Sequence, residues 1–354
     1  MHLGTPALLE FYRAHRQDDD LVLATIIATV GSTYRKPGAM MLIARDGDFE
    51  GLISGGCLEG DLLQHAAEVF ASGTAKRVTY DMHADDDLVW SLGLGCDGVI
   101  HLLLQRLERG SSFGFLEQLE RAQGLRRAVL LALVTQSDGV LPVGAHGCLD
   151  SGGTAAGDRS LLDLLEDAAE PWPDWRFDTF RFGARAAGEA IAVQVPPPPR
   201  VLICGAGPDA VPLARLLVEL GWETVVVDHR PAFARADRFP ARCTVLQTRP
   251  ERLAEVLAPE TLDAAVIMSH HLENDSAYLG CLAPFGISYV GVLGPRARRM
   301  RLAKLSGLSD STIFGPVGLD IGAELPASIA LAVVAEIHAV LNQRDGRSLT
   351  EKDT

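Results

Sequence analysis

Gly205-Ala206-Gly207-Pro208-Asp209-Ala210 is the stretch that decides the fold of the second half of this 354-residue chain. The apolar run at 200–204 before it predicts a buried strand, and the apolar periodicity at 211–220 after it predicts a helix. Another strand is expected at 223–227 and leads into Asp228, 23 residues after the first glycine (228 − 205 = 23). This strand, turn and helix with a following acid form a dinucleotide-binding fingerprint in its G-x-G-x-x-A form.

Each residue of the fingerprint has an expected role. Gly205 makes the turn, Gly207 lets a pyrophosphate approach the helix N-terminus, and Asp228 could hold ribose hydroxyls. Arg230 leaves the choice between NAD and NADP open, because its guanidinium could meet a ribose phosphate. The alternative is a doubly wound domain whose nucleotide cleft is empty.

Strands and helices continue to alternate after the fingerprint. The expected elements are strands at 244–247, 264–268 and 288–293 and helices at 250–257 and 326–341. A further helix is expected to open at Gly294-Pro295 and to carry Arg296, Arg298, Arg299 and Arg301. This alternation predicts a Rossmann-like, doubly wound parallel sheet in a C-terminal domain at 200–345, followed by a tail at 346–354.

His270 follows the strand expected at 264–268. Ligands of open α/β sheets bind beyond the carboxyl ends of the strands, so His270 is a candidate proton carrier or metal ligand. A cap of the following helix is an equal alternative.

Four prolines at 196–199 predict a stiff linker between two domains. The N-terminal domain at 1–195 is rich in strands that do not alternate with helices, which predicts an α+β domain with a mixed or antiparallel sheet. The chain as a whole is therefore expected to be α/β. The expected elements of the first half are helices at 8–16 and 113–123 and strands at 21–30, 39–45, 49–53, 77–81, 99–105, 128–135 and 190–195, with a loop at 148–157.

Gly31-Ser32-Thr33-Tyr34-Arg35-Lys36-Pro37-Gly38 is expected to be a loop between two of these strands. The hydroxyl of Ser32 and the cations of Arg35 and Lys36 suit a phosphate or another oxyanion. An ordinary solvated loop is the alternative.

Ser54-Gly55-Gly56-Cys57 stands before an amphipathic pattern, so Cys57 is expected at the N-terminus of a helix. Amide groups there stabilise an anion, which favours a nucleophilic or metal-binding thiol, and Gly55 and Gly56 allow a ligand close to the backbone. A tight turn with a small buried residue is the alternative. Cys96 is a second cysteine between glycines and could meet Cys57, although nothing in the spacing requires it.

Composition limits the classes of function. A hydrophobic fraction of 47% and a mean hydropathy of +0.14 indicate a globular chain. The formal charge of −14 argues against general nucleic-acid binding. No apolar run reaches the length of a membrane span, so we expect a soluble, cytoplasmic protein. None of the six cysteines forms a Cys-x-x-Cys pair.

The sequence resembles the XdhC/CoxI family, the xanthine dehydrogenase accessory proteins that mature molybdenum hydroxylases. The resemblance rests on the two motifs beginning at Gly31 and Ser54 and on Gly93-Leu94-Gly95-Cys96, Gly205-Ala206-Gly207-Pro208, Met268-Ser269-His270, Tyr289-Val290-Gly291-Val292-Leu293-Gly294 and Gly315-Pro316-Val317-Gly318-Leu319-Asp320-Ile321-Gly322-Ala323. Asp97 departs from the family, where glycine is more common.

The resemblance implies an accessory protein or chaperone rather than a turnover enzyme. It would bind molybdenum cofactor, protect it during sulfuration and deliver it to an apo molybdenum hydroxylase. Cys57 would be a molybdenum ligand or persulfide carrier with Cys96 assisting, and Arg35 and Lys36 would anchor an anion. The fingerprint loop and Asp228 would hold a nucleotide portion of the cofactor.

Several features of the function stay open at this level. The cofactor could carry a cytidine nucleotide, the sulfur could come from a cysteine desulfurase, and a homodimer is expected because two-fold dimers are the commonest closed assemblies. The alternative class is an NAD(P)-dependent oxidoreductase in which Cys57 or His270 performs redox or proton chemistry. A docking scaffold without a working cleft is a third possibility.

Overall fold

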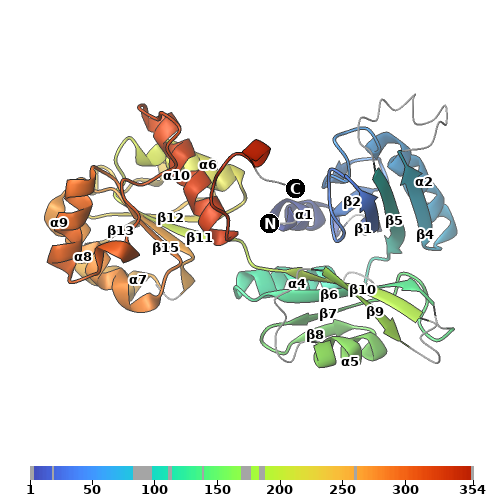
Figure 1. Ribbon diagram of the computed structural model, residues 1–354. Coiled ribbons are helices and arrows are strands. Elements are labelled where there is room, and N and C mark those ends of the chain that lie inside the picture. The colour runs from blue at the N-terminus through green and yellow to red at the C-terminus, as the bar shows by residue number, and fades with distance from the viewer. Residues whose placement is uncertain are drawn as a thin grey trace. The chain divides into compact units, whose positions relative to one another are not determined.

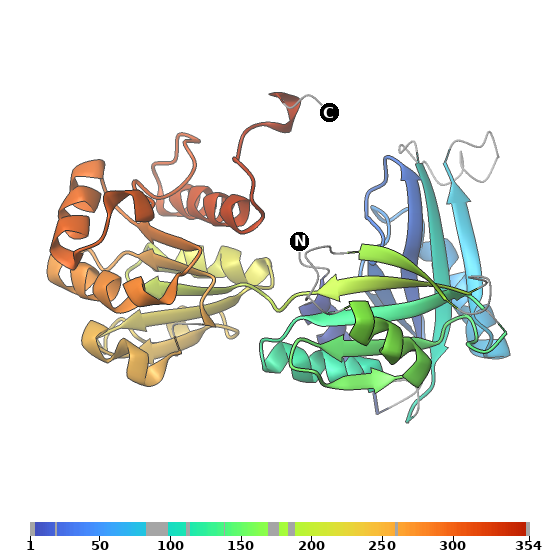
Figure 2. The same ribbon diagram turned by 60° about the horizontal axis from the view of Figure 1, so that its bottom comes forward.

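The chain divides into two compact units, of which the first ends at Pro197 and the second begins at Pro198. Figures 1 and 2 show the computed structural model in two views. The structure describes residues 4–17, 20–82, 98–110, 114–137, 139–168, 177–182, 188–258 and 261–351. Across these ranges, no helix is both long and apolar enough to cross a membrane.

The N-terminal unit begins with a five-stranded antiparallel sheet, here called the first sheet. Its strands are β1 (Leu21–Gly31), β2 (Met40–Ala44), β3 (Phe49–Glu50), β4 (Lys76–Asp81) and β5 (Gly98–Leu107), in the order β3-β2-β1-β5-β4. Helix α1 (Thr5–His15) precedes β1, and α2 (Glu59–Ser72) joins β3 to β4. The β-branched and apolar sequence of β1 suits its central position in the sheet.

A second five-stranded antiparallel sheet completes this unit. It consists of β6 (Val129–Gln136), β7 (His146–Asp150), β8 (Ala155–Gly157), β9 (Phe177–Phe182) and β10 (Gly188–Val195), in the order β8-β7-β6-β10-β9. Helix α4 (Gly114–Gly124) precedes β6, and α5 (Arg159–Ala168) lies between β8 and β9 in the chain. The antiparallel pairing confirms the expected α+β character of this half.

The two halves of the N-terminal unit repeat one topology, which the sequence analysis did not detect. Each half runs helix, three strands, helix, two strands, and each sheet has the same strand order. The backbone details repeat as well. Gly38 donates to the carbonyl of Ile26 at 2.8 Å, and Gly144 donates to the carbonyl of Val134 at 2.9 Å. Gly51 (φ 105°) and Gly157 (φ 116°) take the same place in the two β-hairpins.

The two sheets pack face to face through one shared apolar core. Helices α1 and α4 both contribute to this core, whereas α2 and α5 cover the opposite faces of their sheets. The contacts across the core are reciprocal: a Cβ at Gly38 would lie 2.8 Å from Val193, and a Cβ at Gly144 would lie 3.5 Å from Gln105. The repeats are therefore related as two halves of a pseudo-symmetric pair.

The expected loop at 148–157 is wrong, because the segment forms a β-hairpin. Strands β7 and β8 pair through Cys148↔Ala156 and Leu149↔Ala155. The small residues between them form the turn, in which the Asp150 carboxylate accepts from the amides of Gly152 at 2.8 Å and Thr154 at 2.9 Å. The glycine and serine residues of this segment form a tight turn between two strands and not an extended loop.

The C-terminal unit is built on a five-stranded parallel sheet. Its strands are β11 (Arg200–Cys204), β12 (Glu223–Asp228), β13 (Thr244–Gln247), β14 (Ala264–Ile267) and β15 (Tyr289–Val292), in the order β13-β12-β11-β14-β15. Helices α6 (Ala210–Glu219) and α10 (Pro326–Leu341) cover one face, and α7 (Leu253–Val256), α8 (Leu272–Leu282) and α9 (Arg296–Ser306) cover the other (Figure 1). The unit confirms the expected Rossmann-like doubly wound fold.

Candidate functional site

Strand directions bring two N-terminal motif loops, and the strand ends that flank the third motif, to one edge of the first sheet. Antiparallel pairing places the end of β1, the start of β2 and the end of β3 at the same edge. The end of β4 and the start of β5 share it, because Gly31 pairs with Gly98 and Asp81 pairs with Val99. The loop at 32–39, the loop at 51–58 and the segment between β4 and β5 therefore all leave from this edge.

The loop at 32–39 packs tightly onto the start of β5. A Cβ at Gly98 would lie 2.5 Å from the carbonyl oxygen of Ser32, so the close approach requires glycine there. The Thr33 hydroxyl donates to the carbonyl of Arg35 at 2.8 Å and holds the loop in place. Ser32 and Lys36 are exposed and Arg35 is half-buried.

The cations of this loop are available for an anion. No acidic side chain among the described residues pairs with Arg35 or Lys36. Tyr34, beside them, exposes 60% of its surface. The loop therefore offers two cations and hydroxyl groups at the edge where the other motif segments begin.

Glu59 organises the loop that carries Cys57. Its buried carboxylate accepts from the amides of Ser54 at 2.9 Å and Ile53 at 3.2 Å, and from the Ser54 hydroxyl at 2.6 Å. Burial alone would raise the pKa of Glu59, but hydrogen bonds from Ser54 and its neighbours outweigh burial and lower that pKa below its ordinary value. A charged carboxylate therefore lies under the loop.

The amide groups before α2 are not free, which changes the reasoning about Cys57. The Ser54 hydroxyl oxygen accepts from the amides of Gly56 at 3.2 Å, Cys57 at 3.0 Å and Leu58 at 3.0 Å. Cys57 also precedes Leu58, the N-cap of α2, so the thiol lies just outside the helix. The expected activation of the Cys57 thiol by free helix amides is therefore wrong, because the Ser54 hydroxyl already binds these amides.

Open space borders the two glycines beside Cys57. Among the described residues, nothing lies within 4 Å of a Cβ built at Gly55 or Gly56, and Gly56 has φ 105°. Cys57 itself is half-buried and forms no disulfide. A flat ligand could therefore reach the loop backbone and a soft sulfur donor together.

Cys96 and the neighbouring Asp97 lie outside the described residues. Gly98, the next residue, lies at the shared edge beside Gly31. The expected meeting of Cys96 with Cys57 stays a prediction.

The repeated topology shows that the long loop carrying Cys57 is peculiar to the first repeat. Between the hairpin glycine and the next helix there are seven residues in the first repeat (52–58) but one in the second, Asp158. The strand-to-strand loops do not differ in this way, because eight residues (32–39) lie between β1 and β2 and nine (137–145) lie between β6 and β7. Glycines at 38, 47 and 51 recurring at 144, 153 and 157 were the sequence signal for this comparison.

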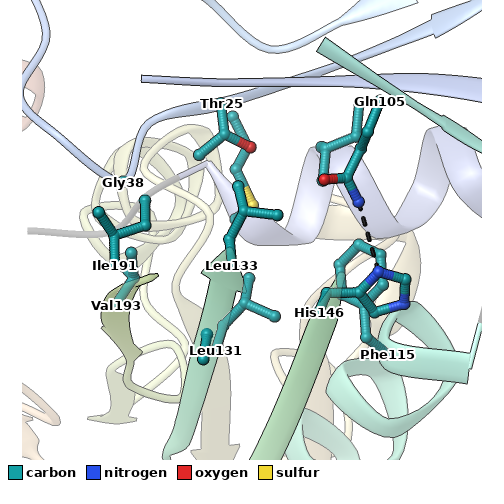
Figure 3. Close-up of a pocket in the computed structure, with 12 residues that line it drawn as sticks. Thr25, Gly38, Gln105, Phe115, Leu131, Leu133, His146, Ile191 and Val193 are labelled. Carbon is teal, nitrogen blue, oxygen red and sulfur yellow. Dashed lines mark hydrogen bonds between the residues drawn. The ribbon is translucent and has the colours of Figure 1, made fainter. Parts of the chain in front are cut away.

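A small cavity lies between the two sheets of the N-terminal unit, and Gly38 at the end of the loop at 32–39 lines it. Its volume of about 10 Å³ suits roughly one water molecule. Figure 3 shows the Gln105 amide pointing to the His146 ring across it, with Nε2 and Nδ1 3.4 Å apart. Burial lowers the pKa of His146. This cavity is a feature of the shared core and is too small for a cofactor.

In the C-terminal unit, Gly205 has φ 114° and lies against the end of β14. A Cβ there would lie 2.7 Å from the backbone of Ser269, so glycine is required for close packing of two strand ends. A Cβ at Gly207 would lie 2.6 Å from Oδ1 of Asp209. The fingerprint turn thus holds an acid directly beside its second glycine.

Asp228 is 1% exposed and its carboxylate is occupied by the protein. Oδ2 accepts from the amide of Ala206 at 2.8 Å, and the Arg230 guanidinium donates to both oxygens at 2.9 and 2.7 Å. These hydrogen bonds outweigh burial and lower the pKa of Asp228. In this arrangement Asp228 supports the turn, and contact with a ribose would require Arg230 to move.

His270 pairs with Asp209 through Nε2 and Oδ2, 2.7 Å apart. Its backbone has φ 62°, a left-handed conformation that costs a non-glycine residue about 1–3 kcal/mol. The N-cap of α8 is His271, so His270 is not the cap of that helix. Asp209 was missed by the sequence analysis, although an acid inside a phosphate-type loop was a visible signal.

The described residues contain no ready-made metal site. Among the residues that the structure describes, no three His, Cys, Asp or Glu side chains are grouped as a metal site. The residues at the shared edge nevertheless fit a molybdopterin in their chemistry: a sulfur donor, glycines with open space, and cations for a phosphate.

The fold and these sites define a class of protein: a duplicated antiparallel unit with a thiol-bearing loop, followed by a Rossmann-type unit. The chain belongs to the XdhC and CoxI family. The model of that family matches residues 14–81, and the model of the XdhC Rossmann domain matches residues 201–337.

Similar proteins cover nearly the whole chain. A protein of Bacillus subtilis (strain 168), described as a probable xanthine dehydrogenase subunit, is 34% identical over 95% of this chain and 96% of its own length. The molybdenum cofactor insertion chaperone PaoD of Escherichia coli (strain K12) is 25% identical over 93% of this chain and 86% of its own length. A crystal structure described as a xanthine dehydrogenase from Bacillus halodurans has a TM-score of 0.80 at 28% identity, covering 99% of this chain and 98% of that one.

Proposed function

We propose that this chain binds molybdenum cofactor, holds it during sulfuration and delivers it to an apo molybdenum hydroxylase of the xanthine dehydrogenase type. The observation that carries the proposal is the convergence of the loops at 32–39 and 51–58 on one edge of the first sheet. The loop at 51–58 is much longer than its counterpart in the second repeat, where Asp158 alone separates the hairpin glycine from the next helix, so the additional chain lies where the ligand would bind. The description of PaoD as a molybdenum cofactor insertion chaperone supports the same role.

The residues divide this task by their chemistry. Arg35, Lys36 and the Ser32 hydroxyl would take the phosphate or pyrophosphate of the cofactor. Gly55 and Gly56 would let the ligand approach the backbone, and Cys57 would bind molybdenum or carry a persulfide with Cys96 assisting. The bound cofactor would supply the molybdenum centre, and the chain would hold and shield it.

The proposed role is that of a cytoplasmic accessory protein and not of a turnover enzyme. Its partners would be the apo hydroxylase and a cysteine desulfurase that donates sulfur. A homodimer is part of the same proposal, since closed two-fold assemblies are the commonest. A cytidine dinucleotide form of the cofactor would use the Gly205 loop for its base and ribose, because Asp209 beside Gly207 disfavours a pyrophosphate there.

A second candidate, an NAD(P)-dependent oxidoreductase, is favoured by the glycine turn between β11 and α6. Two contacts weigh against it. The Asp209 carboxylate lies beside Gly207, where a pyrophosphate would approach, and both oxygens of Asp228 already bind Arg230. Like charges at such close range repel. We therefore rank this function below cofactor insertion.

Anaerobic titration of the purified protein with molybdenum cofactor, with NAD(P) as the competing ligand, tests the proposal. Removing a cation that binds phosphate should weaken the complex about tenfold, so Arg35→Gln and Lys36→Gln are expected to raise the Kd. Cys57→Ala should reduce transfer of active cofactor to an apo hydroxylase. Matched controls are Arg301→Gln, an exposed cation of α9, and Cys243→Ala, another half-buried thiol.

If Cys57→Ala bound and transferred active cofactor as the wild type does, the role of the thiol would be wrong. Binding of NAD(P) alone, without affinity for the cofactor, would replace the proposal with the oxidoreductase.

A further inference from the structure

A pocket of about 460 Å³ opens at the carboxyl edge of the parallel sheet in the C-terminal unit. This volume lies in the range of small-molecule sites. Its walls are mainly hydrocarbon and come from the end of β14, the segment after β15, the segment before α10, and helices α6 and α10. They include Leu213, Met268, Leu293, Val317, Ile329 and Val333. Such walls suit the faces of a flat ring.

The polar groups of the pocket are held in place by the protein. Asp209 and His270 both line it and are joined by the 2.7 Å contact between Oδ2 and Nε2. The loop that carries His270 is tied down by buried Asp275, which accepts from the amide of Ser269 at 3.1 Å and from Arg298 at 2.7 Å. The left-handed backbone of His270 is thus maintained by surrounding contacts, as is typical of functional residues.

The pocket offers acceptors and lacks cations. Oδ1 of Asp209 is buried and has no hydrogen-bond partner among the described residues. Glu324 also lines the pocket, whereas none of its described lining residues is lysine or arginine. Because a buried acceptor without a donor is costly, the site favours a ligand that brings N–H groups and disfavours a phosphate.

We propose that this pocket binds the amino-substituted edge of a planar pyrimidine-type heterocycle, with the N–H groups of that edge donating to Asp209. A carboxylate is a suitable acceptor for an exocyclic ring amine, as in its pairing with the cytosine amine. The ring faces would lie against the hydrocarbon walls, and His270 would orient the carboxylate. The choice of this heterocycle rests on the proposed function, in which the pterin ring or a cytosine base of the cofactor could supply the edge.

Titration of the whole protein with a free pterin, with cytidine and with NAD⁺ tests this assignment. Pterin binding is followed by its fluorescence and cytidine binding by calorimetry. We expect one of the two heterocycles to bind saturably, NAD⁺ to bind more weakly, and Asp209→Asn to weaken the bound heterocycle at least about tenfold. Which heterocycle binds identifies the part of the cofactor that the pocket takes.

Two further variants keep the test decisive. Ile329→Trp fills the pocket from α10 without changing the acid pair and should also abolish binding. Glu273→Gln removes an exposed acid outside the pocket and should leave binding unchanged. Circular dichroism of each variant checks that it is folded.

The assignment is overturned if neither heterocycle binds, if Asp209→Asn and Ile329→Trp bind as the wild type does, or if NAD⁺ binds more tightly than both. These outcomes are separate from the test of the proposed function. If cofactor binding depends on Cys57 and Arg35 but neither free heterocycle binds, the pocket assignment is wrong and the proposed function stands. If a heterocycle binds in a way that depends on Asp209 but the cofactor does not bind, the pocket assignment stands and the role in cofactor insertion is wrong.

Discussion

The buried carboxylate of Glu59 should contribute measurably to the free energy of unfolding, because it accepts several hydrogen bonds. Its carboxylate accepts from Ser54, Ile53 and Leu58. In Glu59→Gln one oxygen becomes an NH2 group that faces these donors, so we expect the free energy of unfolding to fall by about 2 kcal/mol. Urea unfolding at neutral pH measures the change.

Glu68→Gln is the matched control, because Glu68 lies on the same helix and is exposed. Its urea midpoint should stay near the wild-type value. Equal midpoints for Glu59→Gln and the wild type would mean that the loop does not depend on this carboxylate. Since the folded-state pKa of Glu59 is lowered, its contribution is present above the pKa of the unfolded chain and is lost as the pH falls through the folded pKa.

His146 should make the N-terminal unit sensitive to mild acid. Burial lowers its pKa, so the unfolded chain binds a proton more readily than the folded chain does. Stability is therefore complete above the unfolded pKa of about 6.5 and declines as the pH falls towards the folded pKa. Between pH 7.5 and 5.5, we expect His146→Gln to lose about 1 kcal/mol less unfolding free energy than the wild type loses.

His101→Gln serves as the control for this experiment. His101 belongs to the same unit, and its Nδ1 lies 3.0 Å from the Thr79 hydroxyl in an exposed contact. The variant should keep the pH dependence of the wild type. An unchanged pH dependence in His146→Gln would show that protonation of the buried ring does not limit stability.

The two β-hairpins β2–β3 and β7–β8 should respond alike to mutation if they are true repeats. A Cβ at Gly51 would meet the carbonyl of Met40, and a Cβ at Gly157 would meet the carbonyl of His146. Both glycines also have positive φ. We expect Gly51→Ala and Gly157→Ala each to lower the free energy of unfolding by about 2 kcal/mol or more, measured by urea unfolding.

Gly47→Ala and Gly153→Ala are the paired controls, because both glycines have positive φ and no described atom lies within 4 Å of the added Cβ. They should cost about 1 kcal/mol, the strain of the backbone alone. A large loss at one hairpin glycine and none at its counterpart would argue against equivalent packing in the two repeats.

Most elements were predictable because their signals are local. The strand, turn and helix from β11 to α6 and the bounds of α10 agree with the sequence. The hairpin at β7–β8 was missed because its short strands contain glycine and alanine and no β-branched residue. The duplication was missed because the two repeats share a strand order and three glycines but no continuous stretch of similar sequence.

The molecule should unfold in two steps. The apolar clusters of the N-terminal unit contain residues between Leu8 and Val195 only, and those of the C-terminal unit begin at Val201. Separate cores favour separate cooperative transitions. We expect two calorimetric transitions. Gly51→Ala should lower the midpoint temperature of the N-terminal transition only. Leu279→Ala removes a buried side chain of α8, costs about 2–5 kcal/mol, and should lower the midpoint temperature of the C-terminal transition only.

A single transition that both variants shift equally would contradict independent cores. The wild-type scan at two heating rates is the control, because a shift with rate would indicate irreversible unfolding.

The sequence by itself determined the Rossmann-like unit, the strand-rich character of the first half and the motif loops. Hydrophobic periodicity and turn residues act over a few positions, so one sequence suffices to recognise them. The tertiary structure decided which groups are free. Ser54 and Glu59 occupy the amides expected to activate Cys57, Arg230 occupies Asp228, and Asp209 meets His270 across 61 residues. Strand register and loop packing bring these partners together, and neither can be predicted from a short stretch of sequence.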